Sequence, residues 1–248
     1  MIRIGVAGWS IPRHQAHRFP TDGTHLERFS RVFSCVEINS SFYRHHSAAT
    51  YGRWASSTPP RFQFAVKLPR TITHELRLIG ARQALAQFLK ETEGLGGKRG
   101  PVLVQLPPSS WFDARVAGRF FGMFRDRYDG PIVCEPRHAT WFTTSARRLL
   151  VEHHIARVAA DPVCAPGANE PGGWKGLAYF RLHGSPRMYW SIYDEAFIKG
   201  LAKAIRMIAR TADVWCVFDN TALGAAIDNA VELRGRIKPA QLAPAERP

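Results

Sequence analysis

The sequence predicts an α/β protein built as a TIM-like (β/α)8 barrel in a single domain. Eight short runs of β-branched and aromatic residues follow one another, and most are followed by a segment with helical periodicity. Strands that alternate with helices favour parallel pairing and right-handed crossovers. Eight such units in 248 residues match the size of this barrel. We expect the barrel to span residues 1–238, and residues 239–248 to form a flexible tail.

Each predicted strand is a short apolar run in which successive side chains point to opposite faces. One face can therefore pack against helices while the other lines the interior. The runs are Ile2–Ala7, Val36–Asn39, Phe62–Lys67, Pro101–Leu106, Pro131–Glu135, Arg157–Ala160, Ala178–Leu182 and Val214–Asp219.

The segments between these runs carry apolar residues at helical spacing. The first helix opens with a capping box at Thr24 and Glu27, and the helix predicted at Ala81–Glu93 stops at a group of glycines. The connection Pro162–Gly176 differs, because it is rich in Pro and Gly and has no helical period. We expect it to form an irregular loop that can cover a site. The other helices are marked by Tyr51 and Trp54, by Val116, Phe120 and Phe124, by Leu149 and Leu150, by Phe197, Leu201, Ile205 and Ile208, and by Leu223, Ile227 and Val231.

Composition restricts the partners of the chain. The formal net charge of +14 favours anionic small molecules or nucleic acid, although a general arginine coat would give the same value. No apolar run approaches the ~18–20 residues that span a bilayer. The four cysteines form no C-x-x-C pair, as expected for reduced thiols. We therefore expect a basic, cytoplasmic protein with no membrane partner, and the oligomeric state stays open.

Polar residues gather where the predicted strands end. Glu37 and Asn39 share one face at the end of the second run, and Lys67 ends the third. Because the carboxyl ends of parallel strands meet at one end of a barrel, these side chains predict a functional site there. The other strand ends contribute Gln105, Glu135, Asp161, Arg181, His183 and Asp219.

We interpret this group as an anion-binding site with acid–base residues. Glu37 and Glu135 are the predicted general acid and base, and His183 is a second catalytic proton carrier. Cations at the same strand ends suit phosphate, above all the planar guanidinium of arginine. Aromatic residues offer stacking surface for a base or sugar. The predicted substrate-binding residues are Trp9, Asn39, Tyr43, Lys67, Arg137, His138, Trp141, Arg181, Asp219 and Asn220.

The sequence lacks the motifs of several common enzyme classes. Phosphate-loop, dinucleotide, nucleophile-elbow and zinc motifs do not occur. A carboxylate-rich metal site using Glu37, Glu135, Asp161, Asp219 and His183 stays open as an alternative. Lys67, Arg137 and Arg181 would repel a metal ion from these residues, so we predict no metal site, and the sequence implies no cofactor. Structural alternatives remain open: Glu37 and Arg181 can form an internal ion pair, and Asp219 can cap the last helix.

Three functions fit these residues. The leading one is an enzyme, a hydrolase or lyase, acting on a phosphate-bearing or nucleic-acid substrate. The second is a glycoside-hydrolase-like reaction that uses Glu37 and Glu135, which requires carboxyl separations of about 5–5.5 Å or about 6.5–9.5 Å. The third is a non-enzymatic nucleic-acid-binding protein.

Seven ordered motifs resemble those of a known family. They are G-V-A-G-W at 5–9, V-E-I-N-S-S-F-Y-R at 36–44, F-A-V-K at 64–67, L-V-Q-L-P-P at 103–108, E-P-R-H-x-x-W at 135–141, Y-F-R-L-H-G at 179–184 and F-D-N-T at 218–221. From Ile2 to about Arg236 the chain resembles the YecE-like, domain-of-unknown-function 72 (DUF72) family. The resemblance implies a TIM-barrel-like fold and no particular reaction. By fold alone such barrels are similar to sugar isomerases and apurinic endonucleases, whose dense His/Asp/Glu metal clusters this chain lacks.

Overall fold

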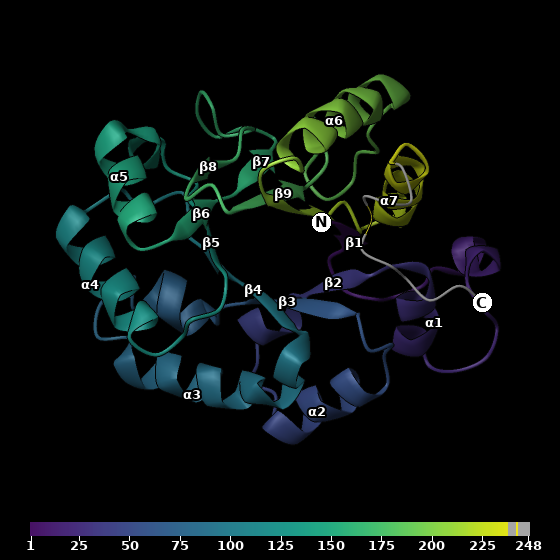
Figure 1. Cartoon of the computed structure of the whole chain (residues 1–248), viewed down its shortest axis with the longest axis horizontal. Helices are drawn as coiled ribbons and strands as arrows, with labels where there is room; N and C mark the ends of the chain where they lie inside the picture. The colour runs from purple at the N-terminus through teal and green to yellow at the C-terminus, as the bar shows by residue number, and fades with distance from the viewer. Residues whose placement is uncertain (238–241, 243–248) are drawn as a thin grey trace.

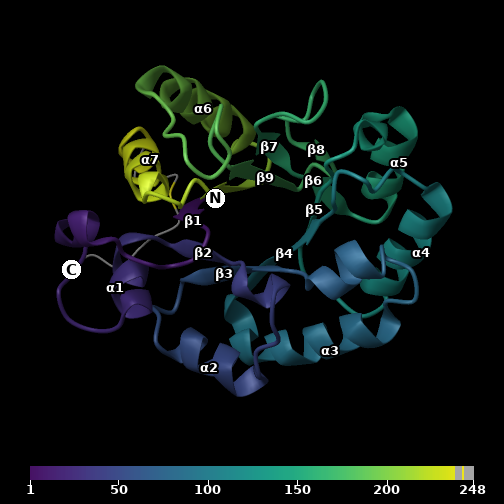
Figure 2. The same cartoon turned by 180° about the vertical axis from the view of Figure 1, so that it is seen from behind.

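The computed structural model describes residues 1–237 and residue 242, and its strands lie inside a ring of helices (Figures 1 and 2). The expected tail from Pro239 to Pro248 lies, apart from Leu242, outside the described residues. One sheet contains four parallel strands in the order β1 (Ile2–Val6), β10 (Asp213–Phe218), β9 (Leu177–Leu182) and β7 (Ala159–Asp161). The other has the order β2 (Cys35–Ile38), β3 (Gln63–Lys67), β4 (Arg99–Gln105), β5 (Ile132–Glu135), β6 (Ile155–Arg157) and β8 (Gly172–Gly173).

The two sheets meet at two places. At one, an isolated parallel bridge joins Ala7 to Glu37, and the Gly8 amide donates to the Glu37 carbonyl at 2.9 Å. At the other, β6 and β7 follow each other in one extended run, and the Val158 amide between them donates to the Cys134 carbonyl at 2.8 Å. The predicted α/β class and parallel pairing are confirmed. A closed eight-stranded barrel is not confirmed, because the strand ladder is interrupted at both places.

The close approach of β1 to β2 depends on Gly5. A Cβ atom at this position would lie 2.3 Å from the carbonyl oxygen of Cys35, which is closer than such atoms can pack. Glycine has no Cβ and so avoids the clash. This contact matters for the site, because β2 carries Glu37 two residues after Cys35.

Seven α-helices pack outside the strands in the described chain (Figure 1). The predicted capping box is confirmed: the Glu27 amide donates to Thr24 Oγ1, and the Thr24 amide donates to Glu27 Oε2. None of these helices is both long and apolar enough to cross a membrane. Their bounds are α1 (His25–Val32), α2 (Ala48–Ser56), α3 (Arg82–Thr92), α4 (Ala114–Arg125), α5 (Thr144–Glu152), α6 (Glu195–Ile208) and α7 (Ala225–Gly235). Shorter turns are η1 (Arg13–Arg18), η2 (Ser40–Phe42), η3 (Thr71–Glu75), η4 (Glu93–Lys98) and η5 (Ala139–Phe142).

The alternation of side chains along the strands produces two separate hydrophobic cores. The larger core includes residues predicted to face the helices, namely Val36, Ile38, Val66 and Leu182. The smaller core consists of Cys35, Ala65, Leu103, Val133, Ala156, Val158, Leu177, Tyr179, Trp215 and Val217. These residues are in phase with the polar strand ends, since Cys35 precedes Glu37 by two positions and Tyr179 precedes Arg181 by two. The interior is therefore apolar toward the amino ends of the strands and polar at their carboxyl ends.

The connection Pro162–Gly176 contains no helix, as predicted. It returns along β6: β8 pairs antiparallel with β6, and the Trp174 amide donates to the Ile155 carbonyl at 2.9 Å. Its first part approaches the predicted site, where Cys164 Sγ lies 3.7 Å from the Pro136 carbonyl oxygen. The loop therefore does not cover the site over most of its length, because it must run back to the amino end of β9.

Candidate active site at the carboxyl ends of the strands

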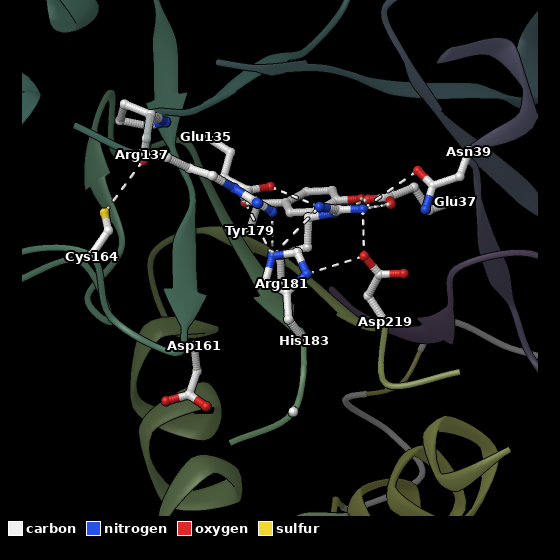
Figure 3. Close-up of polar contacts among 12 residues, drawn as sticks. Glu37, Asn39, Glu135, Arg137, Asp161, Cys164, Tyr179, Arg181, His183 and Asp219 are labelled. Atoms are coloured by element: carbon white, nitrogen blue, oxygen red, sulfur yellow. Dashed lines mark hydrogen bonds and ion pairs between the residues drawn. The ribbon is translucent and has the colours of Figure 1, made fainter. Parts of the chain in front are cut away.

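The guanidinium of Arg181 lies at the centre of a buried polar cluster (Figure 3). Its Nη2 lies 2.7 Å from Glu37 Oε1 and 2.8 Å from Asp219 Oδ2, and its Nη1 lies 2.9 Å from Glu135 Oε2. A single cation at the end of β9 thus holds three carboxylates that come from the ends of β2, β5 and β10. We call Glu37, Glu135, Arg181, His183 and Asp219 the carboxyl-end cluster.

The Glu37 carboxylate accepts hydrogen bonds from three side chains. The Arg181 Nε lies 3.0 Å from each carboxylate oxygen, and the Tyr179 hydroxyl donates to Oε2 at 2.8 Å. The Asn39 carboxamide, oriented to satisfy both partners, donates to Glu37 Oε1 at 2.9 Å and accepts from Arg181 Nη2 at 3.2 Å. A fully buried carboxylate with this many donors has its hydrogen-bonding capacity taken up by the protein. Its geometry suits a structural anchor better than the predicted acid–base role.

His183 bridges the other two carboxylates. Its Nε2 lies 3.0 Å from Glu135 Oε1, and its Nδ1 lies 3.1 Å from Asp219 Oδ2. A ring with acceptors at both nitrogens donates from both, which describes the protonated imidazolium. Burial lowers the pKa of His183, but the charge of Glu135 and the hydrogen bonds with Asp219 and Glu135 outweigh burial and raise the pKa above its usual value.

Glu135 and Asp219 are held in the ionised form. Burial opposes ionisation, but the charges of Arg181 and His183 hold the pKa of Glu135 well below its usual range. The same two partners outweigh burial and lower the pKa of Asp219. A carboxyl group with a depressed pKa is a poor general acid near neutral pH. This argues against a glycoside-hydrolase-like reaction, in which one carboxyl must be protonated.

Lys67 lies beside the cluster without a carboxylate partner. Among the described residues its Nζ forms no hydrogen bond or ion pair, and it lies 4.0 Å from the centroid of the Phe42 ring. Burial, followed by the charge of Arg181, lowers the pKa of Lys67 to about 8. The three carboxylates are already balanced by Arg181, by the His183 imidazolium and by Arg137, whose Nε donates to Glu135 at 3.0 Å. A protonated Lys67 therefore adds one positive charge beyond those that balance the three carboxylates.

The pKa of His74 is sensitive to the positive charges on this side of the site. His74 lies in the turn η3 (Thr71–Glu75), directly after β3. Burial lowers the pKa of His74, and the charges of Lys67, Arg70 and Arg137 lower it further. This region therefore favours an anionic ligand. No helical or strand periodicity marks His74, and the sequence did not predict it as a site residue.

The comparisons with known proteins agree with this fold. A family model described as "Protein of unknown function DUF72" matches residues 3–248. The chain belongs to the DUF72 family. Four of the seven motifs noted in the sequence carry the carboxyl-end cluster, and a fifth carries Lys67. The resemblance inferred from those motifs is confirmed.

Among relatives of this DUF72 chain, Escherichia coli K12 YecE is 33% identical over 107 residues, which cover 43% of this chain and 38% of YecE. Bacillus subtilis YunF is 24% identical over 272 residues, covering 94% and 93% of the two chains. A DUF72 structure from Enterococcus faecalis aligns with TM-score 0.82 and 19% identity over 95% of each chain. One from Thermotoga maritima aligns with TM-score 0.78 and 24% identity over 95% of this chain and 98% of its own. These two structures support the fold.

Asn39, Lys67 and Arg137 lie beside the cluster, and the five other residues predicted to bind substrate in this DUF72 chain lie apart from it. Trp141 is 1% exposed, and its ring nitrogen donates to a backbone carbonyl at 2.9 Å. Asn220 is fully buried, and its Nδ2 donates to a loop carbonyl at 2.9 Å and to a side-chain oxygen of α7 at 3.0 Å. Trp141 and Asn220 therefore present no exposed surface in this structure, and their substrate-binding roles stay predictions. His138 caps the helical turn that begins at the next residue, and Trp9 packs edge-on against another tryptophan. Tyr43 is 79% exposed, so its aromatic ring is accessible from solvent.

Two buried tyrosines were missing from the predicted site of this DUF72 chain. The Tyr179 hydroxyl donates to Glu37. Because Tyr179 lies two residues before Arg181 on β9, strand alternation could have predicted that both side chains lie on the same face. Tyr193 lies in a loop with no periodicity; its hydroxyl donates to Asp161 Oδ2 at 2.7 Å. In Figure 3 Asp161 lies apart from Arg181, so this strand end does not join the cluster.

Proposed function

We propose that the carboxyl-end cluster is the active site of an enzyme that acts on an anionic, phosphate-bearing substrate. The observation that carries this proposal is the buried ammonium of Lys67, which no described carboxylate neutralises, beside a cluster whose charges already balance. An unpaired buried cation is costly, and an anionic ligand would offset that cost. The side chain of Arg137 is 17% exposed and adds a guanidinium that suits phosphate oxygens.

His183 is the proposed proton carrier. It is an imidazolium between Glu135 and Asp219, and a histidine can give up and recover a proton near neutral pH. The two carboxylates orient the ring, while Arg181 and Glu37 hold those carboxylates in place. Sites on parallel α/β folds form at the carboxyl ends of the strands, where this cluster lies.

Anion binding is tested by thermal unfolding with inorganic phosphate and pyrophosphate, against chloride at equal ionic strength. We expect both anions to raise the melting temperature of the wild type, and Arg137→Gln to lose most of the increase. Arg236→Gln is the matched control, because it removes a guanidinium that pairs with Glu195 and Glu232 at the surface. Equal responses in the wild type and Arg137→Gln would contradict the anion site.

Turnover is tested by incubating the protein with a mixture of sugar phosphates and nucleotides and following each mass by mass spectrometry. We expect the wild type to convert at least one compound and His183→Gln to convert none. If neither protein changes any compound, or if both change the same compound at the same rate, the acid–base role of His183 is wrong.

Single-stranded nucleic acid is a second candidate ligand, and the exposed side chains on this end of the fold favour it. Twelve large hydrophobic side chains of the described chain are exposed, and nine of them lie on loops after the carboxyl ends of strands. They include Tyr43, Trp111, Tyr189 and Trp190. The Arg187 guanidinium lies 4.4 Å over the Trp190 ring. Bases stack on such rings while arginines contact the phosphates.

Fluorescence anisotropy with a single-stranded DNA oligonucleotide tests this candidate. We expect Trp111→Ala and Trp190→Ala to weaken binding, and affinity to fall with salt at a slope of about −0.7 per phosphate contact. The control is the double variant Lys199→Glu and Lys203→Glu on α6. If only the α6 variant weakens binding, the charge is a general basic surface and nucleic acid is not the ligand of this site.

A further inference from the structure

We infer that Lys67 is a nucleophilic amine that forms an iminium ion with the carbonyl carbon of the substrate. This inference rests on the proposed function and adds a substrate class, an aldehyde or ketone that carries an anionic group. Lys67 ends β3 at the same end of the fold as His183, and it is 8% exposed. Its Nζ lies over the Phe42 ring and forms no hydrogen bond or ion pair with a described residue.

A lysine attacks a carbonyl only in its neutral form, which desolvation and a neighbouring cation both favour. Both conditions hold here, since burial and then the charge of Arg181 lower the pKa of Lys67 to about 8. At pH 7.5 roughly a quarter of such amines are neutral, against roughly 0.1% for a lysine of ordinary pKa about 10.4. The charged or titratable groups that face Lys67 are Arg181 from β9, Glu135 from β5, Glu37 from β2, Asp219 after β10 and His74 in η3.

The proposed step joins Nζ to the carbonyl carbon and releases the carbonyl oxygen as water. The lone pair of the neutral Nζ attacks the carbonyl carbon, and the π electrons move to the oxygen. The oxygen takes one proton from Nζ and one from the His183 imidazolium, and it leaves as water when the C–O bond breaks. The C=N bond that forms carries the positive charge, and His183 becomes neutral. The iminium withdraws electrons from the adjacent carbon, so a neutral His183 can accept a proton from that carbon.

Reductive methylation of the full chain with formaldehyde and cyanoborohydride, followed by peptide mapping, tests the amine directly. Formaldehyde is the smallest aldehyde and carries no charge. At pH 7.5 we expect Lys67 to react more than about tenfold faster than Lys199 and Lys203, which are exposed on α6. The Lys67 rate should rise with pH and level off above pH about 8. Modification of Lys67 no faster than of the α6 lysines overturns the inference.

Glyoxylate, an aldehyde that carries a carboxylate, separates the nucleophile from the anion site. Reduction of its imine leaves a carboxymethyl group, and we expect a several-fold preference for Lys67 over Lys199 beyond that seen with formaldehyde. Arg137→Gln should remove this extra preference and keep the formaldehyde rate. If Lys67 reacts fast with formaldehyde but shows no glyoxylate preference, the proposed anion site fails and the nucleophile stands. If Lys67 reacts fast with neither aldehyde, the inference that Lys67 is a nucleophile is wrong, whether or not phosphate raises the melting temperature.

Lys67→Arg gives a matched variant, because it keeps a cation and removes the amine. We expect it to retain the phosphate-induced rise in melting temperature and to show no fast-reacting lysine. A fast-reacting amine that persists in Lys67→Arg would assign the reactivity to another lysine and overturn the inference.

Discussion

Arg181 and Glu37 form a buried ion pair in which Nη2 lies 2.7 Å from Oε1 and neither side chain is more than 1% exposed. The same guanidinium reaches Glu135 and Asp219, so three carboxylates depend on one cation. The internal ion pair that the sequence left open is therefore present. Because the Glu37 carboxylate is fully hydrogen-bonded, the chemistry that we propose uses His183, Lys67 and Arg137.

Removal of the central cation should destabilise the fold. Arg181→Met leaves three buried carboxylates without their main partner, and breaking a buried pair costs about 3–5 kcal/mol. We expect urea denaturation to show a loss of this size at pH 7. Arg236→Met, which breaks surface ion pairs, should cost less than about 1 kcal/mol. An Arg181→Met protein as stable as the wild type would mean that the cluster does not hold the strands together.

The stability contributed by His183 should depend on pH. Its pKa in the folded protein is raised, so its contribution is fully present below the ordinary histidine pKa and is lost as pH rises through the folded value. We therefore expect the gap in unfolding free energy between the wild type and His183→Gln to be largest near pH 6 and to shrink toward pH 9. The exposed His17→Gln serves as control, because it removes an imidazole that lies outside the cluster. A gap that grows with pH would show that His183 is neutral in the folded protein.

Lys67→Met should stabilise the protein at neutral pH. The pKa of Lys67 falls from 10.5 to about 8 on folding. The protonated ammonium therefore lowers the free energy of unfolding at pH 7. The gain is at most about 3 kcal/mol, because one pKa unit corresponds to about 1.4 kcal/mol. The gain should decline as pH rises from 8 to 10.5, where the wild-type cost is relieved. Unfolding of both proteins across this range checks the prediction, and a destabilised Lys67→Met at pH 7 would contradict it.

Gly5→Ala should destabilise the fold where the two sheets meet. The added Cβ would lie 2.3 Å from the Cys35 carbonyl oxygen, and overpacking of this kind costs about 1–3 kcal/mol. Gly97→Ala is the control, because no atom lies within 4 Å of its added Cβ. Thermal unfolding should show a lower melting temperature for Gly5→Ala alone. Equal melting temperatures would mean that β1 and β2 can separate there without cost.

The sequence by itself determined most of the strand segments and which face each strand residue takes. It predicted one strand at Arg157–Ala160 where the structure has β6 and β7, and it did not predict β8. Glu37 is in phase with Cys35, and Arg181 with Tyr179, because side-chain alternation is a local property of extended backbone. The same periodicity placed Glu135, Arg181, His183 and Asp219 at one end of the fold. Polar residues at the ends of apolar runs were therefore enough to predict that these side chains lie together.

Only the tertiary structure decided what those residues do. Arg181 and Glu37 are 144 positions apart, and no local pattern states that their atoms meet. The burial of Trp141 and the lack of an ion pair between Lys67 and a described carboxylate likewise depend on how distant segments pack together. Burial and neighbouring charge set the protonation of a side chain, and both are sums over the folded surroundings. For this reason the sequence predicted a charged site, and the fold separated its structural carboxylates from the groups that remain available for chemistry.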